Sequence, residues 1–106
     1  FDGPISVDVV FYMRAPLNVS KKPTPKARAK TWDTFKRFMS ETLWHAKIPD
    51  VDNLVKSLFV SISKAGYNKA DKKGIVWTDD SIVCDLRARK KYSPNPRIEF
   101  EIKELE

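Results

Sequence analysis

The sequence predicts an α+β fold, in which a small mixed β-sheet carries helices packed on one face. Apolar residues alternate with period two near both ends of the chain, and between these stretches they recur at three- and four-residue spacing. No internal repeat or long linker divides the 106 residues. We therefore expect residues 1–106 to form one domain with a single modest core.

Residues 5–13 have the pattern of a half-buried strand, because apolar side chains alternate along them. The next segment, APLNVSKKPTP, is expected to be an irregular basic loop, since proline opposes regular structure. A helix over residues 26–44 follows, and Thr24 before Pro25 is typical of a helix start. Its apolar stripe is expected to face the core rather than DNA bases. The stripe consists of Trp32, Phe35, Phe38, Met39 and Leu43.

A second amphipathic helix is predicted after Pro49, beginning at Asp50 or Val51. Asp52 and Lys56 lie one turn apart on it. The helix therefore starts with two acids two positions apart, followed by a lysine. Its apolar face consists of Leu54, Val55, Leu58, Phe59 and Ile62.

Two more strands are predicted, over residues 81–91 and 97–103, and the intervening SPNP is expected to join them as a hairpin. In the first of them, alternate positions are apolar and the others form a basic outer face. Cys84 alternates with the core positions, so we expect a buried thiol rather than a catalytic one. Trp77, before this strand, is expected to pack beneath the neighbouring acids rather than to stack on a base.

The formal charge of +6 and the pI of about 9.5 suggest a polyanionic partner. The positive charge is regional, with one basic stretch between residues 14 and 47 and another between 87 and 97. Both stretches look like phosphate-binding surfaces, although a solvated charged face gives the same pattern. The candidate DNA-binding residues are Lys21, Lys22, Lys26, Arg28, Lys30, Lys47, Arg87, Arg89, Lys90 and Lys91.

Two absences narrow the class of protein. No apolar run approaches the roughly 18 residues of a membrane span, so no membrane partner is expected. The lone cysteine cannot form an internal disulfide, and the N-terminus lacks the features of a secretory signal. An intracellular, reducing compartment fits best.

The run PDVDNLVKSL, residues 49–58, suggests a metal site. Magnesium prefers oxygen ligands and is typically held by a few carboxylates, water and substrate phosphate. Asp50, Asp52 and Asp80 would supply such ligands if Asp80 lies against the start of the second helix. Lys56 would then neutralise the phosphate or help to position the nucleophile. The alternative is that the acids only cap a helix start, where the dipole favours negative charge.

Three other residues are candidates for supporting roles. Asn53 would orient a ligand or support the helix start. Asp79 would be a further ligand or a turn residue. His45, the only histidine, is expected to be structural or to contact phosphate rather than to act as a metal ligand or general base.

The segments HAKIPDVDNLVKSL and GIVWTDDSIVCDLRARKKYSPNPRIEFEI together resemble the RusA-like Holliday junction resolvases, which are phage and prophage endodeoxyribonucleases. GPISVDVVFYMRAP is similar to the family strand that precedes them. The run P-D-x-D-N-L-x-K with a later W-x-D-D is more specific than an isolated D-x-D. The resemblance implies that Asp50, Asp52 and Asp80 bind magnesium or manganese and that Lys56 is the essential lysine.

The resemblance also implies a substrate and an assembly. Family members act as homodimers that make paired nicks across four-way DNA junctions in recombination and repair. That role implies the cytoplasm of a bacterium or a phage-infected cell. Family members usually carry a further strand and helix before the GPI-like strand, and we expect this chain to lack both.

The rival interpretation is a non-catalytic nucleic-acid-binding module, in which the basic residues bind phosphates and the acids merely cap a helix. A pure binder gains nothing from carboxylates clustered where a phosphate should approach, whereas a metal-dependent nuclease requires them. The acids therefore favour the nuclease.

Overall fold

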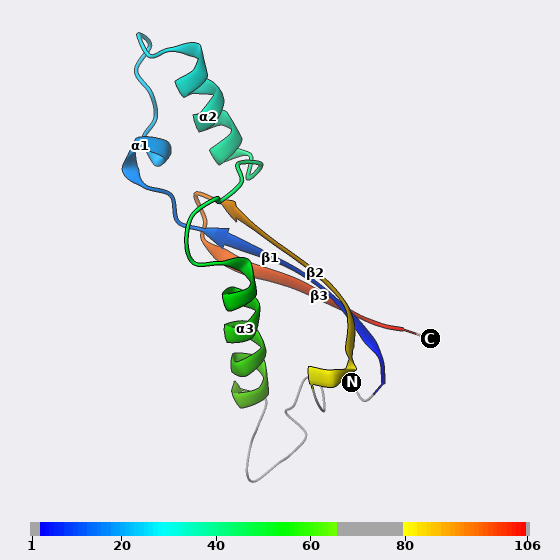
Figure 1. The fold of residues 1–106 in the computed structure, drawn as a ribbon. Coiled ribbons are helices and arrows are strands. Elements are labelled where there is room, and N and C mark those ends of the chain that lie inside the picture. The colour runs from blue at the N-terminus through cyan, green and yellow to red at the C-terminus, as the bar shows by residue number, and fades with distance from the viewer. Residues whose placement is uncertain (1–2, 66–79, 106) are drawn as a thin grey trace. The chain divides into compact units, whose positions relative to one another are not determined.

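The computed structural model describes the backbone of residues 3–65 and 80–105, and their side chains apart from residues 63–65 and 80. Within the described residues, the order along the chain is one strand, three helices, a 3-10 turn and two strands (Figure 1). The elements are β1 (Ile5–Met13), α1 (Leu17–Ser20), α2 (Ala29–Met39), α3 (Val51–Ala65), η2 (Asp80–Ile82), β2 (Val83–Tyr92) and β3 (Arg97–Glu104).

The three strands form one mixed sheet with the order β2-β1-β3, so β1 lies in the centre. β1 and β2 point the same way, whereas β3 runs opposite to them (Figure 1). A parallel pair needs a long crossover connection, which the helices between β1 and β2 supply. The predicted α+β class is confirmed.

The predicted hairpin is wrong, although both of its strands exist. β2 and β3 each pair with β1 and not with each other. The SPNP turn instead passes the end of β1, where the Ser93 N–H donates to the Met13 carbonyl at 2.9 Å. A short turn between two strands predicts their pairing only when no third strand lies between them.

The chain divides into two compact units. Unit 1 comprises residues 1–9, 48–88 and 100–106, and unit 2 comprises residues 10–47 and 89–99. The division cuts through all three strands. Each unit therefore contains a part of every strand. Unit 1 also contains α3, and unit 2 contains α1 and α2.

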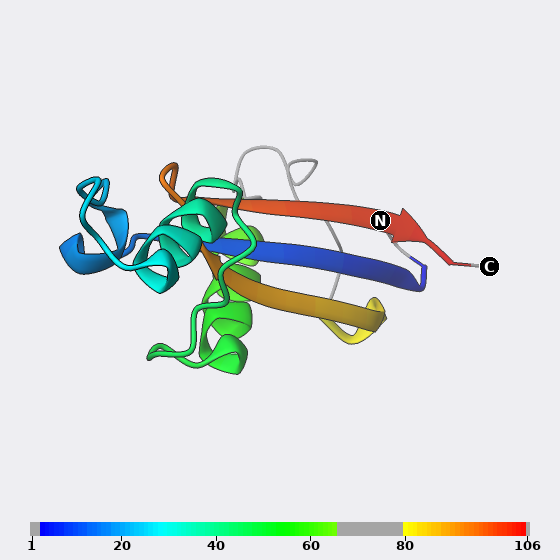
Figure 2. The ribbon, with the colours of Figure 1, turned by 90° about the horizontal axis from the view of Figure 1, so that it is seen from above.

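In unit 1, α3 covers one face of the sheet (Figures 1 and 2). The alternation along β1 leaves Ile5, Val7 and Val9 almost inaccessible to solvent, as the period of two predicts. The apolar side of α3 is buried in the same unit through Val55, Leu58 and Ile62. Burial of this side of the helix determines which of its residues point to solvent.

The thiol of Cys84 is exposed, so the prediction of a buried thiol is wrong. Leu86, two residues further along β2, is also 43% exposed. The reason is position in the sheet: β2 is an edge strand, whereas the equally alternating β1 is central. Trp77 lies outside the described residues.

In unit 2, α2 is shorter than the predicted helix over residues 26–44. The Trp32 indole N–H donates to the Thr24 carbonyl at 3.1 Å, which holds the chain before Ala29 in a turn. The helix ends at Met39, and Glu41 then adopts a left-handed φ of 61°. Leu43 consequently lies beyond the helix, although it still packs on the core of this unit.

The core of unit 2 is built around Ala15, Phe38 and Tyr92. Phe38 is the member of the predicted apolar stripe that is fully buried, while Met39 is 51% exposed. A further helical turn, α1, occurs within the predicted loop and packs against α2. The loop prediction failed there because Pro16 precedes this turn and does not stand within it, so the missing N–H of proline removes none of the turn's hydrogen bonds.

Candidate functional site

Two carboxylates, Asp50 and Asp52, are presented to solvent at the start of α3. The Leu54 N–H donates to the Asp50 carbonyl at 3.1 Å, so Asp50 directly precedes the first turn of the helix and Asp52 lies in it. Both residues are exposed. The unpaired N–H groups and the dipole at a helix start favour negative charge there. The predicted start of this helix is confirmed.

Lys56 follows Asp52 by one turn of α3 and is also exposed. Since Val55 and Leu58 are buried on either side of it in the sequence, the packing of α3 directs Lys56 to solvent. Asp52 and Lys56 then lie on one side of the helix, because residues four apart are neighbours on a helix surface. Asp52 and Lys56 are thereby held one helical turn apart, with Asp50 directly before the helix.

Asp80, the third predicted ligand, begins η2, and its side chain lies outside the described part of the chain. Figures 1 and 2 both draw the η2 backbone apart from the start of α3. Among the described residues, no group of three potential metal-ligating side chains occurs. Convergence of Asp80 with Asp50 and Asp52 therefore stays a prediction. Asp79 lies outside the described residues.

Of the supporting candidates, Asn53 is exposed in the first turn of α3. His45 is 7% exposed, and its ring centre lies 4.7 Å from that of Tyr92. Burial lowers the pKa of the His45 imidazole from 6.5, and the charge of Lys90 lowers it further. A buried, neutral imidazole packed on an aromatic ring supports the structural interpretation of this residue.

The first basic group, which we name the α2 basic face, precedes and begins α2 in unit 2. Its members are all exposed. A pocket of about 230 Å³ lies between α1 and α2, where Lys21 and Lys30 are accompanied by Asn18, Thr31 and Thr34. Ammonium groups beside hydroxyl and amide donors suit a phosphate oxygen. The α2 basic face consists of Lys21, Lys22, Lys26, Arg28 and Lys30.

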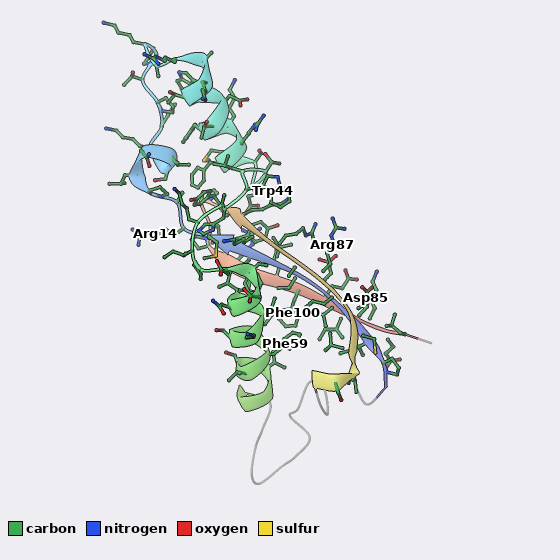
Figure 3. The ribbon with its side chains drawn as sticks, viewed as in Figure 1. Arg14, Trp44, Phe59, Asp85, Arg87 and Phe100 are labelled. Atoms are coloured by element: carbon green, nitrogen blue, oxygen red, sulfur yellow. The ribbon has the colours of Figure 1, made fainter. Side chains whose placement is uncertain are left out.

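The second basic group, the β2 basic end, surrounds the end of β2 in unit 2. Lys47 is exposed, and Arg89, Lys90 and Lys91 are half-buried. The Lys90 ammonium donates to the Lys47 carbonyl, which ties the segment before α3 to the strand. Arg87 belongs to unit 1 and projects with Asp85 from the sheet face that α3 does not cover (Figure 3).

Sequence patterns missed one residue of this region, Trp44, which is 61% exposed beside Lys91. The spacing of the preceding apolar residues predicts a helix that includes Trp44, so the sequence gives no sign of its exposure. In the structure α2 ends at Met39, and Trp44 lies beyond the helix.

Comparison with known proteins identifies similar sequences. A sequence model of the family described as endodeoxyribonuclease RusA matches residues 1–103. An uncharacterized protein of Bacillus subtilis (strain 168), YqaN, is 35% identical over 103 residues, which cover 97% of this chain and 59% of YqaN. No solved structure matches. Within the described residues, no helix combines the length and the apolar character needed to span a membrane.

Proposed function

Because the chain belongs to the RusA endodeoxyribonuclease family, we propose that it is a metal-dependent nuclease that cleaves four-way DNA junctions. The observation that carries the proposal is the exposed pair Asp50 and Asp52 at the start of α3, with Lys56 one turn later. Together, the two acids and the lysine supply the oxygen ligands and the positive charge that metal-dependent phosphodiester cleavage requires.

Magnesium fits the chemistry of these donors, and manganese has similar requirements. Asp50 and Asp52 offer hard oxygen ligands in an exposed position that water and a phosphate oxygen can also reach. When bound, the metal would activate water and stabilise charge on the phosphate. The two carboxylates would hold it, and without a cation their negative charge would repel the phosphate.

Lys56 has a separate role in this proposal. Its ammonium group carries a positive charge toward the side of α3 on which Asp52 lies. There it would contact a non-bridging phosphate oxygen and stabilise the charge that grows during cleavage. An ion pair with Asp52 alone would contribute little to stability on an exposed helix.

Unit 2 supplies the DNA-binding charge in this proposal. The lysine and arginine side chains of the α2 basic face are exposed, and those of the β2 basic end are exposed or half-buried. Phosphate contacts of this kind bind and orient DNA without reading its sequence. Discrimination between bases is therefore not expected from these two groups.

We also propose a homodimer with two-fold symmetry. Paired nicks need two active sites at a fixed separation, and a two-fold dimer presents the same surface twice. The separation of η2 from the start of α3 adds a second reason (Figures 1 and 2). If Asp80 is a ligand, a second copy of the chain can bring it to Asp50 and Asp52.

The test is cleavage of a labelled four-way junction and of a linear duplex, with magnesium, with manganese and with a chelator. We expect metal-dependent cleavage of the junction, which Asp50→Asn and Asp52→Asn each abolish while junction binding is retained. Asp85→Asn is the matched control, since Asp85 is an exposed acid of unit 1 on β2. Full activity of both α3 variants would refute the assignment.

A further inference from the structure

Trp44 is a large aromatic side chain held in solvent by an ordered backbone. Its exposure is 61%, whereas the next residue, His45, is 7% exposed and Leu43 before it packs on the core of unit 2. Such an alternation is that of a strand, with every second side chain pointing outward. Trp44 is thus the outward residue of a short extended segment (Figure 3).

Two hydrogen bonds attach this segment to the edge of β2. The Tyr92 N–H donates to the Leu43 carbonyl at 2.9 Å, and the His45 N–H donates to the Lys90 carbonyl at 3.2 Å. Trp44 itself forms an antiparallel bridge with Lys91. The indole is therefore presented from a fixed backbone, which reduces the entropy lost when a ligand binds.

The chemistry around Trp44 favours a nucleic-acid ligand. The Lys91 ammonium nitrogen lies 4.9 Å from the centre of the indole ring, in a cation–π contact. Lys47 follows the segment that contains Trp44, and Lys90 lies in β2 next to Lys91. The Lys90 ammonium donates a hydrogen bond to the Lys47 carbonyl. An aromatic face among ammonium groups provides stacking for a base and charge for the adjoining phosphates.

Core packing does not account for this side chain. Phe38, Tyr92 and Ala15 make the buried cluster of unit 2, with Leu43 packed on it, and Trp44 is not a member. An apolar protein partner would also cover an exposed tryptophan. The adjacent positive charge argues against that occupant, since charged residues are depleted at the centres of protein interfaces.

We propose that Trp44 stacks on an unpaired base of the DNA substrate, while the β2 basic end, which includes Lys91, binds the flanking phosphates. The ligand class is a nucleobase in single-stranded or locally unpaired DNA. Such bases occur where a duplex is opened at a branch point. This inference rests on the proposed function for its substrate, but the stacking itself does not require cleavage.

The test compares two probes in the presence of a chelator: a labelled oligothymidine strand and a labelled blunt duplex of the same length. Trp44→Leu keeps an apolar side chain but removes the aromatic face. We expect it to weaken oligothymidine binding by roughly 5- to 140-fold, which is the range for loss of one stacked base, with duplex binding almost unchanged. Trp44→Phe, which retains an aromatic ring, should recover most of the loss.

Trp32→Leu is the matched control, because Trp32 is a half-buried tryptophan of α2 in the same unit. Its effect should be equal on the two probes. Equal weakening of both probes by Trp44→Leu, or no weakening of either, would overturn the stacking proposal. Trp44-dependent oligothymidine binding by a protein without metal-dependent cleavage would retain the stacking site and reject the nuclease.

Discussion

The two units of this protein differ sharply in charge. Unit 2 contains 13 Lys and Arg against 3 Asp and Glu, a formal charge of +10, whereas unit 1 contains 7 against 11, a charge of −4. The proposed function requires basic groups that attract a polyanion and acidic groups that would hold a cation. In this proposal the basic groups come mainly from unit 2 and the acidic groups from unit 1.

The cores of the units differ as well. Unit 1 buries aliphatic side chains of β1 and α3, such as Val7 and Leu58. Unit 2 buries Phe11, Phe38 and Tyr92, with the imidazole of His45 among them. Each large ring buries much area, so a few of them make a core for a small unit.

A single network joins the loop after α2 to β3 in unit 2. The Arg97 guanidinium donates to the two Glu41 carboxylate oxygens at 2.6 and 3.1 Å, and Ser93 also donates to Glu41. Arg97 lies over the Tyr12 ring at 4.0 Å. The hydrogen bonds from Arg97 and then Ser93 lower the pKa of Glu41. This network fixes the turn that ends α2 and thereby the path of the chain toward Trp44.

The largest expected effect concerns unit 1, the acidic unit, and the proposal that a second copy of the chain brings Asp80 to its Asp50 and Asp52. Asp50→Asn and Asp80→Asn should each be inactive, but their co-expressed mixture should regain cleavage, because a mixed dimer contains one intact shared site. That mixture should produce single nicks rather than paired ones. Junction cleavage by the purified mixed dimer is the measurement.

A mixture of Asp50→Asn with Asp52→Asn is the matched control for this experiment. Both changes lie at the start of α3, so every site in a mixed dimer lacks one ligand. An inactive Asp50/Asp80 mixture, with mixed dimers demonstrated, would show that each site is built within one chain.

A smaller effect is expected in the basic unit. Joint replacement of Lys21, Lys22, Lys26 and Arg28 by Gln should weaken duplex binding. It should also flatten the dependence of log affinity on log salt by about 0.9 for each phosphate contact removed. Binding over a salt series measures both quantities. Lys103→Gln, an exposed lysine of unit 1, is the control, and an equal loss of slope in it would remove the distinction between the units.

The smallest expected effect is the pH dependence of stability due to His45. Its pKa is lowered in the folded state, so the unfolded chain binds a proton first as the pH falls. This contribution to stability is complete above 6.5 and is lost as the pH falls from there toward the lowered folded value. Thermal unfolding at about pH 7.5 and about pH 5.5 should show the loss.

His45→Gln should remove this step, since no other histidine occurs in the chain. Glu41 acts in a separate window, because its lowered pKa stabilises the fold above 4.5 and the effect is lost below that value. An unchanged step between pH 7.5 and 5.5 in the variant would exclude His45 as its origin.

The sequence by itself determined the strand at residues 5–13, the helix that starts at Val51 and the placement of Asp50, Asp52 and Lys56 at that start. These features depend on local backbone geometry, whose periods of two and 3.6 are visible in the order of apolar residues. The motif also predicted the family, which the sequence comparison shows.

Only the tertiary structure decided which strands pair, which faces are covered and which units form. Cys84 and Val7 both alternate with polar residues, yet Val7 is buried in the central strand and Cys84 is exposed on an edge strand. Trp44 points to solvent because hydrogen bonds to β2 hold it there, and its partners lie far along the sequence. Burial depends on neighbours brought together by the whole fold, and local periodicity carries no information about them.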